Sequence, residues 1–156
     1  MSQIGDADRR ILRVIQDEPG ISMRDLGERT GLSHLPCWRR RQRMQEEGIV
    51  SPPQHLVDPE AVGFDILVFC FVKITQHSRE ALGRFEEAVI RVPEVLQCHS
   101  LSGEYGDVLQ VVATSVRADE ATVKNALTAL PNVQSINTSF TLKRVKNSHK
   151  VPPSRR

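Results

Sequence analysis

The chain has few aromatic residues and no long apolar segment. Aromatic residues occupy 4% of its 156 positions, whereas hydrophobic residues as a whole occupy 39%, so a folded core must be mainly aliphatic. No apolar run approaches the ~20 residues that a membrane-spanning helix needs, and no signal peptide precedes the first expected helix. These absences argue against a membrane protein and predict a cytoplasmic one.

The chain also has little that would support catalysis or metal binding. Its three cysteines are odd in number and lack C-x-x-C spacing, which argues against a disulfide scaffold or a zinc site. Cys98 and His99 cannot act as a nucleophile and its base on one strand, because neighbouring strand residues point to opposite faces. We therefore predict no catalytic residue, no metal ion and no cofactor.

Acidic residues are absent from the C-terminal end. Residues 143–156 hold 6 basic and no acidic residues, whereas residues 51–142 hold 6 basic and 11 acidic ones. Residues 1–50 are nearly balanced, with 9 basic and 8 acidic residues. The basic end has two adjacent prolines and no apolar pattern. We expect residues 147–156 to form a disordered tail that adds non-specific attraction to a polyanion such as DNA.

Residues 21–50 contain the signals for two short helices joined by a tight turn. Ser22 and Asp25 form a capping box at the start of the first helix. Gly31 supplies the left-handed residue that ends this helix. An amphipathic segment at residues 8–15 precedes the pair. Three such helices predict a helix-turn-helix domain.

The second helix of the pair is strongly basic. Ser33 is expected to cap it, and Pro36 falls in its first turn, where a missing N–H is tolerated. Residues 33–47 carry four arginines, while the only acids, Glu46 and Glu47, lie in the last turn. This distribution is typical of a recognition helix that lies in the major groove of DNA. A solvated charged face remains the alternative.

The basic helix supplies most of the predicted DNA contacts. We expect Arg39, Arg40 and Arg43 to divide between phosphates and base edges, with residues of the helix's N-terminal half near the bases. Arg41 falls on the inner side of the helix and must extend its charge to solvent. The predicted DNA-binding residues are Ser22, Met23, Ser33, His34, Leu35, Trp38, Arg39, Arg40 and Arg43.

The spacing of residues around the basic helix is that of a known family pattern, GLS-x-x-x-C-x-x-R-x-x-R-L-x-x-x-G-x-I. The matching positions are Gly31-Leu32-Ser33, Cys37, Arg40, Arg43, Met44, Gly48 and Val50. On these residues the chain resembles the Lrp/AsnC family of feast/famine transcriptional regulators. The resemblance implies a DNA-binding domain followed by a domain that binds an amino-acid effector and assembles into dimers, tetramers or octamers.

From residue 65 onward, the pattern changes to strands alternating with helices. The order is βαββαβ, which predicts a ferredoxin-like fold and an α+β protein as a whole. The expected strands are residues 66–74, 95–101, 108–113 and 133–142, and the expected helices are residues 78–91 and 119–130. The predicted organisation is a helix-turn-helix domain at 1–50, a linker at 51–64, the ferredoxin-like domain at 65–146 and the tail at 147–156.

The first expected strand is apolar on both faces. Val68, Cys70 and Val72 share one face, while Phe69 and Phe71 lie on the other. Because the two helices of this fold cover one side of the sheet, a partner must bury the opposite side. A homodimer is the simplest partner, and it predicts a DNA site with two-fold symmetry.

The loop between the second and third strands is a candidate effector site. The family motif reads roughly G-x-[YF]-D-[YF]; Gly103 and Tyr105 match it, whereas the motif's aspartate and second aromatic fall on Gly106 and Asp107. An ordinary strand-connecting turn remains the alternative. The predicted effector-binding residues are Gly103, Glu104, Tyr105, Gly106, Asp107 and Thr138.

These patterns favour a sequence-specific transcriptional regulator whose partners are double-stranded DNA, a second copy of itself and an amino acid. Two alternatives remain open. In the first, the protein is an architectural DNA-binding protein without an effector. In the second, it is an amino-acid-binding regulatory subunit of an enzyme, and its helical domain binds to another protein instead of DNA. An enzyme in its own right is not expected, because no catalytic constellation is present.

Overall fold

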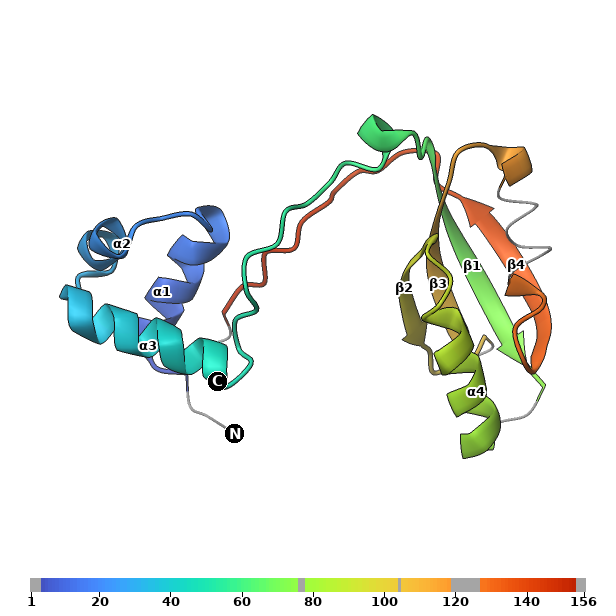
Figure 1. The fold of residues 1–156 in the computed structure, drawn as a ribbon, viewed down its shortest axis with the longest axis horizontal. Helices are drawn as coiled ribbons and strands as arrows, with labels where there is room; N and C mark the ends of the chain where they lie inside the picture. Colours follow the sequence, from blue (N-terminus) through green and yellow to red (C-terminus); the bar gives the residue numbers. More distant parts are fainter. Residues whose placement is uncertain (1–3, 76–77, 104, 119–126, 154–156) are drawn as a thin grey trace. The chain divides into compact units, whose positions relative to one another are not determined.

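The computed structural model describes residues 4–75, 78–103, 105–118 and 127–153. The chain forms two compact units (Figure 1). The first comprises Met1–His55 together with Lys146–Arg156, and the second comprises Leu56–Val145. The described part of the predicted tail, residues 147–153, is thus grouped with the N-terminal helices, and its disorder stays a prediction.

The first unit contains three helices, α1 Asp6–Asp17, α2 Met23–Thr30 and α3 His34–Glu46. This arrangement confirms the predicted helix-turn-helix. Its core is small and mainly aliphatic, because α3 contributes only two buried apolar side chains to it. The buried apolar residues are Ile11, Leu12, Ile15, Leu26, Cys37 and Met44.

The predicted caps of α2 and α3 differ in outcome. The Ser22 hydroxyl accepts a hydrogen bond from the backbone N–H of Asp25 at 3.1 Å, and Gly31 ends α2 with φ of 67°. Ser33 occupies the N-cap position of α3, but its side chain makes no capping hydrogen bond. Pro36 stands at the third helical position and has no N–H, so one of the two backbone amides that a cap residue can bond is missing.

Gly27 is a close-packed residue whose role the sequence pattern did not predict. A Cβ atom built on Gly27 would lie 2.8 Å from the backbone oxygen of Leu32. The end of α2 therefore approaches the chain entering α3 more closely than any larger residue at this position would allow.

The second unit is a four-stranded antiparallel sheet in the order β2-β3-β1-β4 (Figure 1). This order confirms the ferredoxin-like prediction. The first strand begins and ends where it was predicted, and the bounds of the other described elements differ from the predicted ones by no more than two residues. The elements are η1 Glu60–Val62, β1 Ile66–Ile74, α4 Arg79–Val89, β2 Val95–Ser100, β3 Asp107–Ala113 and β4 Val133–Phe140.

Two predicted elements need separate mention. Residues 119–126 of the expected second helix lie outside the described residues, although Leu127 and Leu130, which follow them, are buried in the core. In the linker, the described residues between α3 and η1 form no strand, which agrees with the loss of backbone donors at its two prolines. Among the described helices, none has the length and apolar character to cross a membrane.

The two faces of β1 have different surroundings. Val68, Cys70 and Val72 are fully buried beneath α4, where they contact Phe85 and its neighbours. On the opposite face, Phe69 remains 38% exposed. The described helix α4 therefore covers one side of the sheet, and an aromatic side chain lies at the surface of the other.

Candidate nucleic-acid interface and ligand loop

A buried carboxylate joins the recognition helix to the first helix. Asp8 on α1 is 1% exposed. Its two oxygens accept hydrogen bonds from the guanidinium groups of Arg40 at 3.0 Å and Arg43 at 2.8 Å, both on α3. These are also the two arginines of the family pattern. We call Asp8, Arg40 and Arg43 the carboxylate clamp.

The clamp keeps Asp8 ionised. Burial alone would raise the pKa of its carboxyl group, but the backbone N–H of Gly5 and the guanidiniums of Arg40 and Arg43 outweigh burial. The pKa of Asp8 therefore lies below its ordinary value. The same carboxylate accepts the Gly5 N–H at 3.0 Å and so caps α1 while it holds α3.

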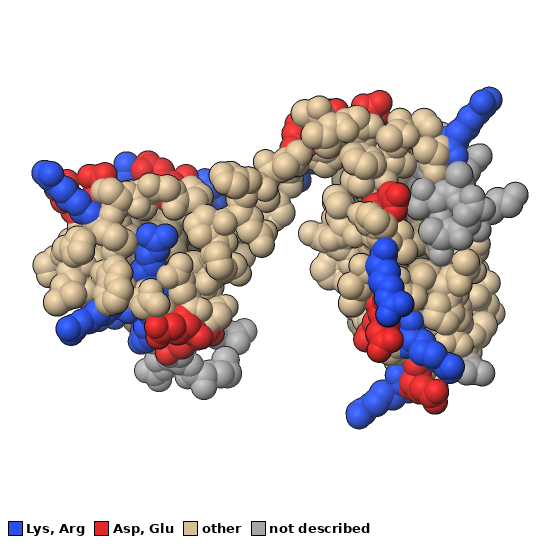
Figure 2. Space-filling view, viewed as in Figure 1, with Lys and Arg blue, Asp and Glu red and all other residues tan. Residues whose placement is uncertain are grey.

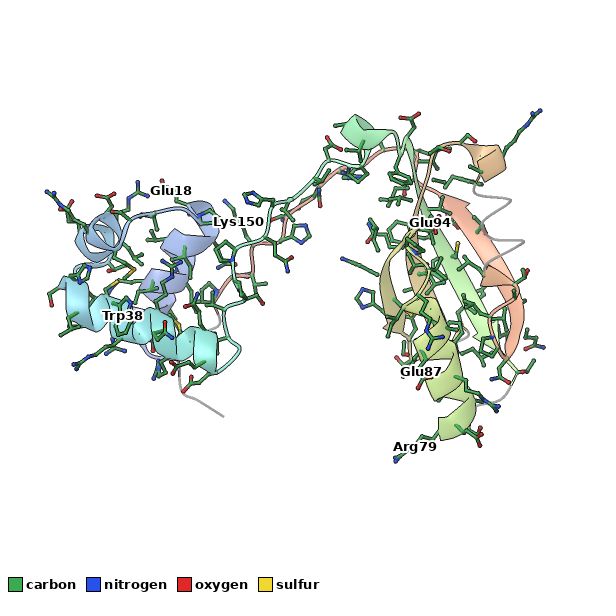
Figure 3. The ribbon with its side chains drawn as sticks, viewed as in Figure 1. Glu18, Trp38, Arg79, Glu87, Glu94 and Lys150 are labelled. Carbon is green, nitrogen blue, oxygen red and sulfur yellow. The ribbon has the colours of Figure 1, made fainter. Side chains whose placement is uncertain are left out.

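The outward face of α3 carries the side chains that remain available to a ligand. Leu35 is 52% exposed and Trp38 is 47% exposed, and Figure 3 labels Trp38 on this helix. His34 and Arg39 are exposed as well. The first two turns of α3 therefore present one imidazole, one guanidinium and the apolar side chains of Leu35, Pro36 and Trp38 to solvent.

The remaining predicted DNA contacts divide into exposed and packed residues. Ser22 and Ser33 are exposed at the starts of α2 and α3. Met23 is half-buried, and its sulfur lies 3.6 Å from a guanidinium nitrogen of Arg41. The charged end of Arg41 thus lies beside Met23 of α2, in keeping with the prediction that it reaches out of the core.

The charges of this unit are interspersed. Figure 2 shows Lys and Arg side chains next to acidic ones on its visible face. Part of this mixture comes from local ion pairs, including Arg29 with Glu18 at 2.8 Å and Arg9 with Asp6 at 3.0 Å. Exposed pairs of this kind contribute little to stability, so the buried clamp is the electrostatic contact that matters for α3.

The predicted effector loop has residues on both faces of the sheet. The Tyr105 ring packs on Phe71, with ring centroids 5.4 Å apart, and its hydroxyl lies 3.5 Å from the side-chain nitrogen of Asn137. Phe71 belongs to the face away from α4. Tyr105 therefore lies at the edge of the open face, beside the surface predicted to bind a second copy.

Asp107 lies on the other face. It stands opposite Val72 in the sheet, is 2% exposed and accepts a hydrogen bond from the Ser100 hydroxyl at 2.7 Å. A pocket of about 270 Å³ adjoins it, with Gly103 at φ of 148° in its wall. The lining residues are Lys73, Ile74, Leu82, Ser100, Leu101, Gly103, Gly106 and Asp107.

Thr138 is not brought to the side of the sheet that Tyr105 occupies. It stands opposite Cys70, and the two side chains approach to 4.0 Å. Directly opposed residues of an antiparallel pair share a face, so Thr138 shares the core face with Asp107. Glu104 lies outside the described residues.

Other reactive groups are isolated. Among the described residues, no group of three or more His, Cys, Asp or Glu side chains is placed to hold a metal ion. Burial, followed by the charges of Asp107 and Glu86, raises the pKa of the Cys98 thiol to about 11. A thiol with this pKa is a poor nucleophile at neutral pH.

Both units match known families. The profile of the winged helix-turn-helix DNA-binding family matches residues 5–51, and that of the Lrp/AsnC ligand binding domain matches residues 67–151. Two similar proteins are the Bkd operon transcriptional regulator of Pseudomonas aeruginosa and the leucine-responsive regulatory protein of Rhizobium meliloti. The first is 33% identical over 93% of this chain and 95% of the relative, and the second is 33% identical over 92% of each.

Solved structures of similar proteins lead to the same family. A transcriptional regulator of Neisseria meningitidis in complex with L-methionine aligns with a TM-score of 0.89 and 33% identity, over 96% of this chain and 97% of that chain. An AsnC family transcriptional regulator of Agrobacterium tumefaciens aligns with a TM-score of 0.88 and 32% identity, over 95% of this chain and 96% of that chain. This chain therefore belongs to the Lrp/AsnC family of DNA-binding transcriptional regulators.

Proposed function

We propose that the protein recognises a specific DNA sequence through the outward face of α3. The single observation that carries this assignment is the exposure of His34, Leu35, Trp38 and Arg39 on one helix while α1 holds the same helix from behind. The N-terminal half of a recognition helix is the part that reaches base edges.

The arginines of α3 have different roles in this proposal. Arg39 supplies an unburied guanidinium for a phosphate or a guanine edge. Arg40 and Arg43 are 41% and 40% exposed, so each combines the bond to Asp8 with a surface that can face a phosphate. Their first task is to fix the orientation of α3. Ser22 and Ser33, at the helix starts, are placed for phosphate contacts.

We also propose a homodimer formed through the open face of the sheet. Phe69 and the Phe71–Tyr105 ring pair supply an aromatic surface that the chain's own described helices leave uncovered. Tyrosine and phenylalanine are enriched at such interfaces. Two copies related by a two-fold axis would present two α3 helices to a site with the same symmetry.

The ligand of the second unit is proposed to be an amino acid. The supporting observations are the buried Asp107 carboxylate beside a pocket in the predicted loop, and a related regulator solved with L-methionine. Asp107 would accept the ligand's ammonium group in a charge-assisted hydrogen bond. We place this binding event, like DNA binding, in the cytoplasm.

The first experiment is selection of bound duplexes from a random DNA pool at near-physiological salt. A two-fold symmetric consensus is the expected result, and bound DNA without a consensus would instead support an architectural role. No recovered DNA would overturn the proposal and favour a ligand-binding regulatory subunit. Calorimetry with L-methionine then tests the pocket: stabilisation of the wild type but not of Asp107→Asn is expected.

A further inference from the structure

The first unit has a groove that none of the proposed activities uses. The groove has a volume of about 650 Å³ and is mainly apolar, with α1, the last turn of α3 and the start of the linker as one wall. The C-terminal residues of the chain form the other wall. The residues that contribute most to the apolar wall are Leu12, Ile15, Ile49, Val50 and Pro53, opposite Val151, Pro152 and Pro153.

One side chain recognises the backbone of the C-terminal segment. The Gln16 side-chain amide donates a hydrogen bond to the carbonyl oxygen of Val151 at 3.1 Å, and its oxygen accepts the Val151 N–H at 2.6 Å. The same amide nitrogen donates to the Leu12 carbonyl at 3.1 Å, which holds the side chain in position on α1. A primary amide that pairs with both polar groups of one residue imitates a neighbouring β-strand.

The side chain of Val151 contributes little to this contact, because 69% of it is exposed. Lys150 pairs with Asp17, but both side chains are about 60% exposed, so this pair adds little stability. The backbone of Val151 is therefore the recognised feature. Figure 3 labels Lys150 on the segment.

We propose that this groove is a docking site for the chain's own residues 149–153, and that docking restrains the DNA-binding unit. The occupant is identified by the observed Gln16–Val151 pair and by the position of Val151, Pro152 and Pro153 along one wall of the groove. Prolines suit this position because they keep the segment extended and have no N–H to leave unpaired.

Docking gives the two units a second connection. The linker provides the first, with 16 residue steps from Val50 to Ile66, a reach of at most ~58 Å. The C-terminal segment provides only 11 steps from Phe140 to Val151, a reach of at most ~40 Å. The shorter tether limits the distance between α3 and the end of β4. Less conformational entropy is therefore lost when two recognition helices bind one DNA site.

Zero-length carbodiimide cross-linking tests docking without DNA. Full-length protein in ordinary and ¹⁵N-labelled forms is unfolded together, refolded and cross-linked, and the Lys150–Asp17 peptide is weighed. Peptides with both halves unlabelled or both labelled are the expected result. Mixed-label peptides would show that a second copy supplies the segment. Absence of the cross-link would show that the segment does not dock on α1. Either result overturns the proposal.

Native-state trypsin cleavage after Lys150 measures the role of Gln16. We expect Gln16→Met to raise this cleavage at least about tenfold, because opening of the segment exposes the bond, while the matched control Asp17→Asn changes it less than about twofold. Equal cleavage in wild type and Gln16→Met overturns the proposal. If Gln16→Met does not fold, amide exchange of Val151 in the unaltered protein decides, since exchange at the rate of a free peptide would also overturn docking.

The consequence for DNA rests on the proposed function. On the selected two-fold site, Gln16→Met should bind about threefold to tenfold more weakly. The salt dependence should stay unchanged, because no phosphate contact is lost. Equal affinity of Gln16→Met and wild type overturns the restraint. Failure of the wild type itself to bind DNA would instead refute the proposed function, because the cross-linking and cleavage results do not depend on it.

Discussion

The two units are held together by different means. In the sheet unit, Val68, Cys70, Val72 and Phe85 are fully buried in an apolar core. In the helical unit, α3 contributes only Cys37 and Met44 to the core, and a buried carboxylate bonds two of its arginines. Apolar contacts tolerate small rotations of a helix, whereas two directed bonds to one carboxylate do not. The carboxylate clamp thus holds α3, the helix whose orientation matters for DNA binding.

The largest expected loss of stability comes from a substitution in the apolar core of the sheet unit. Phe85→Ala should lower the free energy of unfolding of the sheet unit by about 3–5 kcal/mol, because Phe85 is fully buried and its removal leaves a cavity. Scanning calorimetry should show one transition moving while that of the helical unit stays in place. A shift of both transitions by the same amount would contradict the separate stabilities that we infer.

The polar side is tested at Asp8. Asp8→Ala should destabilise the helical unit by about 2–4 kcal/mol, because Arg40 and Arg43 lose their buried partner. Their partial exposure keeps the loss below that of a fully buried pair. A triple variant, Asp8→Leu with Arg40→Met and Arg43→Met, should recover most of the unfolding free energy but not the DNA affinity. Recovery of both would show that the clamp does not orient α3.

Substitutions of the α3 arginines distinguish direct contact with DNA from the orientation of the helix. Arg39→Ala should weaken DNA binding by about 1–3 kcal/mol and leave the thermal transition unchanged. Arg40→Ala and Arg43→Ala should weaken binding by a similar amount while also lowering the transition temperature of the helical unit. Binding titrations and calorimetry on the same preparations compare them. Silent substitution at all three positions would refute the assignment of α3.

Gly27 offers a smaller steric test of the helical unit. Gly27→Ala should destabilise it by about 1–2 kcal/mol, because the new methyl group would meet the Leu32 carbonyl at 2.8 Å and this clash exceeds the gain in helix propensity. Gly83→Ala in α4, where a Cβ meets no atom within 4 Å, is the matched control and should be neutral or stabilising. Denaturant titration resolves the difference.

The two units should also respond to opposite ends of the pH scale. The lowered pKa of Asp8 means that its stabilising effect is complete above the ordinary value of 3.8 and is lost as the pH falls through the folded-state pKa. The raised pKa of Cys98 gives an effect that is complete below 9.0 and is lost as the pH rises toward about 11. Asp8→Asn and Cys98→Ser should each flatten one limb of the profile in thermal scans.

Structural features that depend on residues close together in the sequence were predictable. The start and end of β1, the cap at Ser22 and the left-handed Gly31 depend on neighbouring residues, and the structure confirms each of them. The missing side-chain cap at Ser33 was predictable in part, since Pro36 removes one of the two amides that a cap residue can bond. The pattern placed Pro36 in the first turn but did not connect it with the cap.

Features that join distant residues were not predictable from spacing. Asp8 and Arg43 lie 35 positions apart, and Gln16 and Val151 lie 135 apart. No periodicity within a helix reports such pairs. The effector loop shows a related limit, because register decides that Thr138 shares a face with Cys70, and register depends on all the strands together.

The scarcity of aromatic residues has a practical consequence. The chain has one tryptophan and one tyrosine, and they fall in different units, with Trp38 on α3 and Tyr105 in the loop beside the sheet. Each unit thus carries a natural optical label of its own. Tryptophan emission would follow events at the recognition helix, and tyrosine absorbance would follow events at the loop, in unmodified protein and in a single cuvette.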